Sequence, residues 1–377
     1  MTQLSVAIIG TGTIARTHAE ALLGLGDPAG SAGSGDRGDS GDPGDPAKLV
    51  AAADIDADRL REFCSRYGIA ECRGGLAGLL HDGPPDLVVV CTPPGAHAGQ
   101  ALSCLRAGSS VLVEKPPALS LAEFQEMADA ERPGGPWLAT VFQHRFGSGA
   151  RRLRAMIGSG VLGRPLVAVC HTLWFRDQAY FDEPWRGRWE TEGGGPTMGH
   201  GIHQLDLLAC LLGDWTEVSA LARRQARQME TEDLSLAQVT FASGAVASVV
   251  NSVLSPREES YLRFDFERAT VELRHRYGYR DDDWQITPAP GHEAAVTSAW
   301  AAGEQGVPSG HRAQYAAVLR SLRGRTAPPV TSADALRTMQ LVAAIYASAF
   351  LGRPVRHQDL APDTPFYQRM NGSGARC

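Results

Sequence analysis

The chain has 377 residues, of which 43% are hydrophobic and 21% are charged, so it can bury the cores of two domains. This composition excludes a disordered chain and a small disulfide-stapled one. A net charge of -6 is the wrong sign for a protein dedicated to binding nucleic acid or anionic membranes. The seven cysteines form no CxxC pair, and no apolar run reaches about 18 residues, so we expect a cytoplasmic protein with free thiols and no membrane span.

The cations are divided very unevenly, with 34 arginines against two lysines, Lys48 and Lys115. Arginine keeps its proton in proteins, whereas lysine can lose one. The base composition of the coding sequence is sufficient to explain the ratio. The informative question is therefore which of the two positions needs a lysine.

The first half of the chain alternates strands with helices. A strand at 4–9 leads through a glycine turn into a helix at 14–25, and residues 24–47 form a Gly- and Asp-rich insert of charge -4 that we expect to be disordered. The elements expected after it are strands at 49–53, 86–91 and 110–113 and helices at 57–67, 96–107 and 121–130. This rhythm predicts an α/β Rossmann dinucleotide-binding domain, with a parallel sheet, over residues 1–145.

The second half changes to closely spaced strands. They are expected at 166–175, 218–224, 234–241, 245–251, 261–267 and 269–274, and helices are expected at 314–323 and 332–351. We therefore predict an α+β domain over residues 146–355 with a large open, mainly antiparallel sheet. Residues 356–377 are predicted to be a mobile tail.

A glycine turn follows the first strand and has the GxGxxA pattern of dinucleotide-binding turns. Gly10 permits a tight turn, and Gly12 lets a pyrophosphate approach the backbone. Thr13 and Ile14 begin a helix whose N-terminus attracts anions. These four residues are predicted to bind the cofactor.

Asp54 closes the second strand, 44 residues after Gly10. Without the insert at 24–47 the spacing comes close to the roughly 20 residues expected for the acid that binds the adenosine ribose. Arg59 lies a turn into the following helix, so no arginine directly follows the acid. We therefore predict NAD rather than NADP as the cofactor.

Polar residues also follow the later strands of the predicted parallel sheet. Thr92, Pro93 and His97 come after one strand, and Glu114 and Lys115 come after the next. Open α/β sheets bind ligands at this edge, so all five are predicted cofactor-binding residues. Lys115 could exchange a proton with a substrate hydroxyl. It could equally form a salt bridge with Glu114, and His97 could simply cap the helix that it begins.

Several motifs in order along the chain resemble the Gfo/Idh/MocA family, named for glucose-fructose oxidoreductase and inositol dehydrogenase. They are GTGTIA with His18, CTPPGAH, EKP, FQHRF, WRGRWETEGGG, GIHQLDLL and AIYASAFLGRPV. The resemblance implies hydride transfer between NAD(H) and a carbinol carbon of a sugar, cyclitol or related polyol. It also implies that Lys115 binds cofactor and substrate and assists proton transfer, that His203 is the acid/base, and that homodimers or homotetramers form through the C-terminal sheet.

One position departs from the family pattern. Dehydrogenases of the inositol type commonly carry aspartate four residues before the histidine of GIH, where this chain has Gly199. A carboxylate there would orient the imidazole. Either His203 works without this partner, or His200 or Tyr180 takes over part of the role, or the reaction differs from simple alcohol oxidation.

The predicted substrate contacts combine aromatic and cationic side chains, which suit sugar rings and their hydroxyl or acidic groups. They are Arg145, Tyr180, Trp185, Arg186, His200 and His203. His200, His203 and Asp206 also recur as HxxHxxD, but no fourth ligand is evident, so we predict no metal. His18 is expected to pack or cap. The alternatives left open are a redox-neutral lyase, glycosidase or epimerase with tightly bound NAD, and a non-catalytic dinucleotide or ligand sensor.

Overall fold

The computed structural model describes residues 3–25, 47–81, 83–372 and 374. Most of the insert predicted to be disordered, residues 26–46, lies outside this range. The chain forms two compact units. Unit 1 comprises Met1–Pro117, Glu126–Val141 and His311–Ser332, and unit 2 comprises Ala118–Gln125, Phe142–Gly310 and Ala333–Cys377.

Unit 1 contains a six-stranded parallel sheet in the order β3-β2-β1-β4-β5-β6. Its strands are β1 (Ser5–Ile9), β2 (Lys48–Ala53), β3 (Glu71–Arg73), β4 (Leu87–Val90), β5 (Ser110–Val113) and β6 (Leu138–Thr140). Every residue of β4 is 0% exposed, as expected for a parallel strand covered on both faces. The strand order reverses between β1 and β4, which is where such sheets bind ligands. The predicted Rossmann domain is confirmed.

The helices of unit 1 start and stop at identifiable signals. They include α1 (Thr13–Leu23), α2 (Ala57–Tyr67), α3 (Leu76–His81), α4 (His97–Ala107) and α11 (His311–Gly324), while α5 (Leu121–Asp129) is divided between the units. The Asp56 carboxylate caps α2 by accepting from the Asp58 and Arg59 amides, and Gly68 ends it at φ 64°.

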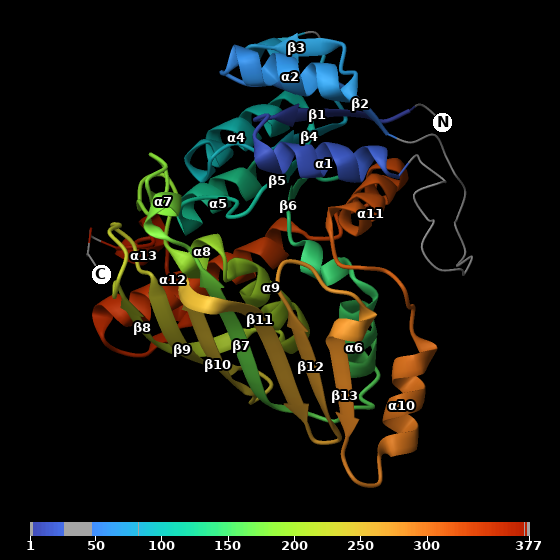
Figure 1. Ribbon diagram of the computed structural model, residues 1–377, viewed down its shortest axis with the longest axis vertical. Helices are drawn as coiled ribbons and strands as arrows, with labels where there is room; N and C mark the ends of the chain where they lie inside the picture. Colours follow the sequence, from blue (N-terminus) through green and yellow to red (C-terminus); the bar gives the residue numbers. More distant parts are fainter. Residues whose placement is uncertain (1–2, 26–46, 82, 373, 375–377) are drawn as a thin grey trace. The chain divides into compact units, whose positions relative to one another are not determined.

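Helix α11 returns to unit 1 from the far end of the chain and packs beside α1 (Figure 1). Its Tyr315, Val318 and Leu319 are buried in the same apolar cluster as Ala19 and Leu22 of α1. The sequence prediction had placed this helix in the second domain. The amphipathic pattern predicted the helix itself, but a pattern within one helix does not identify the surface that its apolar face covers.

Unit 2 is built on an eight-stranded sheet in the order β13-β12-β11-β7-β10-β9-β8-β14 (Figure 1). The strands are β7 (Pro165–Phe175), β8 (Trp215–Arg223), β9 (Leu234–Phe241), β10 (Val246–Ser252), β11 (Leu254–Phe266), β12 (Ala269–His275), β13 (Trp284–Pro288) and β14 (Val355–Arg356). Strands β7 and β10 pair in parallel and the other neighbours are antiparallel. The predicted mainly antiparallel sheet is therefore confirmed.

The remaining elements of unit 2 are mostly helical. They are η3 (Gln143–Phe146), α6 (Ser148–Gly158), α7 (Gln178–Phe181), α8 (Pro196–Gly199), α9 (Ile202–Leu212), η4 (Asp281–Asp283), α10 (Glu293–Ala302), α12 (Ser332–Leu351), η5 (His357–Asp359) and α13 (Pro365–Gln368). No helix in the described part of the chain is both long and apolar enough to cross a membrane.

The prediction of a mobile tail was wrong for its described residues. Its first residue, Arg356, pairs with Glu217 as part of β14, the strand at the edge of the sheet. Farther on, Leu360, Phe366 and Met370 are all buried. These apolar side chains are spaced too widely to show a helical or strand period, but burying them anchors the segment.

Candidate active site

The glycine turn of unit 1 leaves space where an anion would bind. A Cβ on Gly10, which has φ +84°, would lie 2.8 Å from the Thr92 amide nitrogen, so glycine is required where β1 turns past the end of β4. A Cβ on Gly12 would meet nothing within 4 Å. Gly12 caps α1 without a side-chain hydrogen bond, so the first turn of the helix keeps its amide donors. This geometry fits a dinucleotide pyrophosphate.

Asp54 lies at the end of β2, beside this turn. Its carboxylate accepts from the Thr11 amide at 2.7 Å and from Arg59 Nη2 at 3.1 Å. Burial alone would raise the pKa of Asp54, but the bonds from Arg59, Asp56 and Thr11 lower it to about 2. Arg59 lies a turn into α2, as predicted, but its long side chain reaches back five residues to Asp54, a contact that the sequence prediction did not include.

Glu114, which ends β5, is held by a buried cluster of unit 1. Its Oε1 lies 2.8 Å from His18 Nε2 and 3.5 Å from His311 Nε2, and its Oε2 accepts from the Lys115 amide at 3.0 Å. The other ring nitrogen of His18 is 2.8 Å from the Tyr315 hydroxyl. His18 is therefore a packing histidine, as expected. The cluster fixes the backbone at Lys115, a half-buried residue.

His18, Glu114 and His311 are also the one group among the described residues with ligand atoms close enough to hold a metal ion. The ligand atoms lie within 4.8 Å of one another. The short hydrogen bond between His18 and Glu114 accounts for this proximity without an ion. His200, His203 and Asp206 do not form such a group, because Asp206 is bonded to Arg145 and Thr338.

This cluster predicts that acid destabilises unit 1. Burial lowers the pKa of His18 below 6.5, and although burial would raise the pKa of Glu114, His18 and His311 hold it well below 4.5. Both groups bind fewer protons folded than unfolded, so their stabilisation is present above those ordinary values and is lost as pH falls through 6.5 and then 4.5. Urea unfolding at a series of pH values measures this effect. We expect His18→Gln to reduce the loss of unfolding free energy that begins as pH falls through 6.5. A pH dependence of unfolding identical to that of the wild type would contradict the role given to His18.

His97 begins α4, and its ring contacts the backbone that follows two strands, β4 and β5. Its ring nitrogens lie 2.8 Å from the Pro116 carbonyl and 2.7 Å from the Thr92 carbonyl. Burial lowers the pKa of His97, and the two carbonyls oppose that shift. Both nitrogens are therefore used within the protein. His97 and Glu114 support the turns that carry Thr92 and Lys115, and their contact with the cofactor stays a prediction.

In unit 2, Arg145 anchors the helix that carries His203. Its guanidinium bonds Asp206 of α9 through two nitrogens, at 2.8 and 2.7 Å, and approaches Asp334 at 3.4 Å. Burial raises the pKa of Asp206, and the Arg145 charge opposes this shift. The Arg145 side chain is only 7% exposed. Two carboxylates share its charge, so Arg145 has a structural role in unit 2, and its contact with substrate stays a prediction.

His203, at the start of α9, packs against a second histidine, His144 of η3. Its ring centre lies 5.0 Å from that of His144, with the planes 33° apart. His144 Nε2 is 2.9 Å from the Tyr277 carbonyl, and its Nδ1 is 3.3 Å from Gln204 Nε2. An imidazole that donates to a carbonyl through Nε2 and accepts from an amide at Nδ1 is neutral. His203 therefore faces a neutral ring.

The amide of Gln204 extends this arrangement to His275. Gln204 Nε2 lies 3.0 Å from His275 Nε2, and burial together with the neighbouring His144 lowers the pKa of His275 to about 2. Sequence reasoning did not identify Gln204, His144 or His275 as supports of the site. The FQHRF motif, which contains His144, and the GIHQLDLL motif, which contains Gln204, were the available signals for two of them.

The loop before the GGG turn brings the other predicted substrate residues together. The Arg186 guanidinium lies 3.9 Å from the Tyr180 ring centre and 4.1 Å from that of Trp185. The Tyr180 hydroxyl lies 3.4 Å from His200 Nε2. All four side chains therefore belong to one cluster of unit 2, the unit that also carries His203.

Comparisons with known proteins agree with this architecture. The family model described as "Oxidoreductase family, NAD-binding Rossmann fold" matches residues 4–139, and the model "GFO/IDH/MocA C-terminal domain" matches residues 150–273. The chain belongs to the Gfo/Idh/MocA family. It is thus an oxidoreductase with an NAD-binding Rossmann domain.

Individual members of the Gfo/Idh/MocA family match along most of their length. D-glucoside 3-dehydrogenase of Escherichia coli strain K12 is 28% identical, over 93% of this chain and 97% of that protein. Myo-inositol 2-dehydrogenase of Thermotoga maritima is 26% identical, over 66% and 68%. The structure of the WlbA dehydrogenase from Bordetella pertussis, in complex with NADH and UDP-GlcNAcA, is 26% identical, with a TM-score of 0.80 over 94% of this chain and 99% of that one.

Proposed function

We propose that this Gfo/Idh/MocA protein is an NAD(H)-dependent dehydrogenase of a sugar, cyclitol or related polyol, with Lys115 and His203 in proton transfer. The main support is the similarity to D-glucoside 3-dehydrogenase across both units. The glycine turn, Asp54 and Lys115 add to it, because they follow β1, β2 and β5 of one parallel sheet, where ligands bind.

The residues divide the chemistry between them. Bound NAD(H) would accept or donate the hydride. Lys115 offers a partly buried amine that can exchange a proton with a substrate hydroxyl, and the Glu114 cluster fixes the backbone that presents it. His203, 8% exposed and packed on the neutral His144, provides a second group able to take up that proton.

We place the substrate against the loop cluster of Tyr180, Trp185, Arg186 and His200. Aromatic faces suit the C–H faces of a sugar ring, and a guanidinium suits hydroxyls or an acidic group. Arg186 retains some exposure, at 22% of its side chain, unlike the enclosed Arg145. Arg186 is therefore the better candidate for binding a polar substituent of the substrate.

NAD is proposed over NADP on the strength of Asp54, and replacing this residue tests the choice. We expect Asp54→Ala to lower kcat/KM with NAD about tenfold or more, since hydrogen bonds to charged groups contribute roughly 1.5–3 kcal/mol. Loss of Asp54 would also release Arg59 toward a 2′-phosphate, so the NADP/NAD ratio should rise. Steady-state kinetics with both cofactors measure this, with the exposed Asp58→Ala as control. An unchanged ratio would contradict the role of Asp54.

We also propose that the protein forms a homodimer or homotetramer through the sheet of unit 2. Val167 and Val246 are neighbours across β7 and β10, and Leu221 and Leu236 are neighbours across β8 and β9. The strand register places all four on one face, where they are 39–51% exposed. Analytical ultracentrifugation tests this assembly. The cytoplasmic location stays a prediction.

The activity itself is tested by following NADH absorbance while the purified protein is given NAD and a panel of sugars, sugar acids, cyclitols and glycosides. We expect net NADH formation with at least one polyol. Turnover that needs only catalytic NAD and yields no net NADH would favour a redox-neutral lyase or epimerase. Ligand binding without any turnover would favour a sensor.

A further inference from the structure

Glu192 is a buried carboxylate in the loop cluster, and the predicted site did not include it. The residue is 5% exposed. Its Oε2 accepts from the Gly187 amide at 2.6 Å, and Arg186 Nη1 lies 3.4 Å from its Oε1. Burying a carboxylate costs desolvation free energy, which must be offset by the groups that the carboxylate binds. The partners of Glu192 therefore indicate what it does.

The carboxylate of Glu192 points to the backbone at Gly199, at the end of α8. A Cβ built on Gly199 would lie 3.5 Å from Glu192 Oε1, and no other described atom beyond its own helix and chain neighbours is within 4 Å. Gly199 has no positive φ, so its conformation does not require glycine. A Cβ at this distance would make an ordinary van der Waals contact, so a side chain placed at position 199 would lie directly beside the carboxylate.

Glu192 is linked to His200 through two side chains. Arg186 Nη1 bonds both Glu192 Oε1 and the Tyr180 hydroxyl oxygen. Since Arg186 donates to that oxygen, the hydroxyl hydrogen remains for His200 Nε2, 3.4 Å away. This arrangement favours neutral His200 with Nε2 as acceptor. The His200 ring also makes an edge-to-face contact with Trp174, with 5.3 Å between the ring centres. This contact limits the rotation of the imidazole.

We propose that Glu192 is a positioning residue of the active site: its carboxylate, seated against Gly199, orients Arg186, Tyr180 and His200. It thereby supplies from the loop the negative charge that inositol-type dehydrogenases carry in the helix at the position of Gly199. The proposal rests on the proposed function, because the segment that it orients leads directly into His203. A hydrogen-bonded partner fixes the tautomer of an imidazole, and Arg186 and Tyr180 carry the effect of the Glu192 carboxylate to His200.

Moving the carboxylate from the loop back to the helix tests the proposal. We expect Glu192→Gln to lower kcat roughly 10- to 100-fold with little change in KM, as for lost partners of active-site histidines. Gly199→Asp alone should also be impaired, since it places two carboxylates together. The double variant E192Q/G199D should regain about tenfold over Glu192→Gln. Glu190→Gln, an exposed neighbour in the same loop, is the matched control and should behave as wild type.

Two results would overturn the proposal. One is a Glu192→Gln variant as active as Glu190→Gln, and the other is a double variant no more active than Glu192→Gln. Thermal unfolding identifies any variant that does not fold. In that case Glu192→Asp, which withdraws the same charge by one methylene, replaces Glu192→Gln, and the same fall in kcat is expected.

An NMR readout separates this proposal from the proposed function. Heteronuclear spectra of the His200 ring should show the neutral tautomer with Nε2 unprotonated in the wild type and in Glu190→Gln, and a mixed state in Glu192→Gln. Identical His200 spectra in all three proteins would overturn the role of Glu192, whether or not the wild type oxidises any sugar. Absence of NADH formation by the wild type with a normal His200 response would instead overturn only the proposed function.

Discussion

Replacing Lys115 by arginine should lower kcat about 10³-fold, although the positive charge is kept. A guanidinium can bind an anionic or polar group but cannot give up its proton, whereas an amine can do both. Lys115 is half-buried at the end of β5, and its backbone amide is fixed by Glu114. The variant therefore tests proton exchange separately from charge.

The chain provides its own control for this experiment. Lys48, the other lysine, is exposed at the start of β2, so Lys48→Arg should keep wild-type kinetics. Lys115→Ala should fall at least as far as Lys115→Arg and should be partly restored by added small primary amines. If Lys115→Arg kept more than about half of the wild-type kcat, Lys115 would not be a proton-transfer group.

Replacing His203 by asparagine should lower kcat by roughly 10²- to 10⁴-fold, the usual contribution of general acid or base catalysis. Asparagine keeps a polar tip but is smaller and has no ring, so the ring contact with His144 is lost and thermal unfolding is measured alongside the kinetics. The limb of the kcat–pH profile that reports the His203 imidazole should disappear together with the activity. Steady-state kinetics across pH measure both effects.

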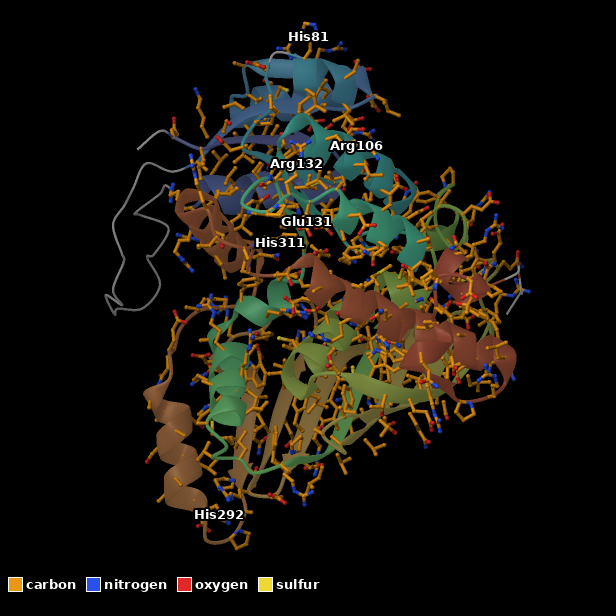
Figure 2. The ribbon with its side chains drawn as sticks, turned by 180° about the vertical axis from the view of Figure 1, so that it is seen from behind. His81, Arg106, Glu131, Arg132, His292 and His311 are labelled. Atoms are coloured by element: carbon orange, nitrogen blue, oxygen red, sulfur yellow. The ribbon has the colours of Figure 1, made fainter. Side chains whose placement is uncertain are left out.

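His81, an exposed histidine at the end of α3 (Figure 2), gives the matched control, and His81→Asn should leave the pH profile unchanged. A His203→Asn variant with full kcat and an intact pH profile would remove His203 from the proton chemistry. In that outcome His200, which is hydrogen-bonded to Tyr180, would be the next residue to replace.

The cofactor half of the fold was predictable because its signals are local. The glycine turn needs Gly10 for a backbone reason that the structure shows directly, in the 2.8 Å approach to Thr92. Asp54 could be placed at the end of its strand once the insert was subtracted. Both inferences rest on a strand, a turn and a helix that are adjacent in sequence.

What could not be predicted depends on contacts between distant segments. Arg145 looked like a substrate ligand because nothing in FQHRF reveals Asp206, 61 residues away. The bounds of α9 were not predicted, because ten of its 11 residues are buried and no polar face marks a period. Glu192 is seven residues from Gly199, and only the folded loop brings its carboxylate against that glycine.

The most direct test of hydride transfer follows the substrate hydrogen itself. A polyol that supports NADH formation is prepared with deuterium on the carbinol carbon and incubated with the protein and NAD, and the reduced cofactor is analysed by mass spectrometry. Our account predicts deuterium in the NADH, with the label strongly reduced in Lys115→Arg and in His203→Asn at equal reaction times. A product formed with its deuterium retained and an unlabelled cofactor would contradict it.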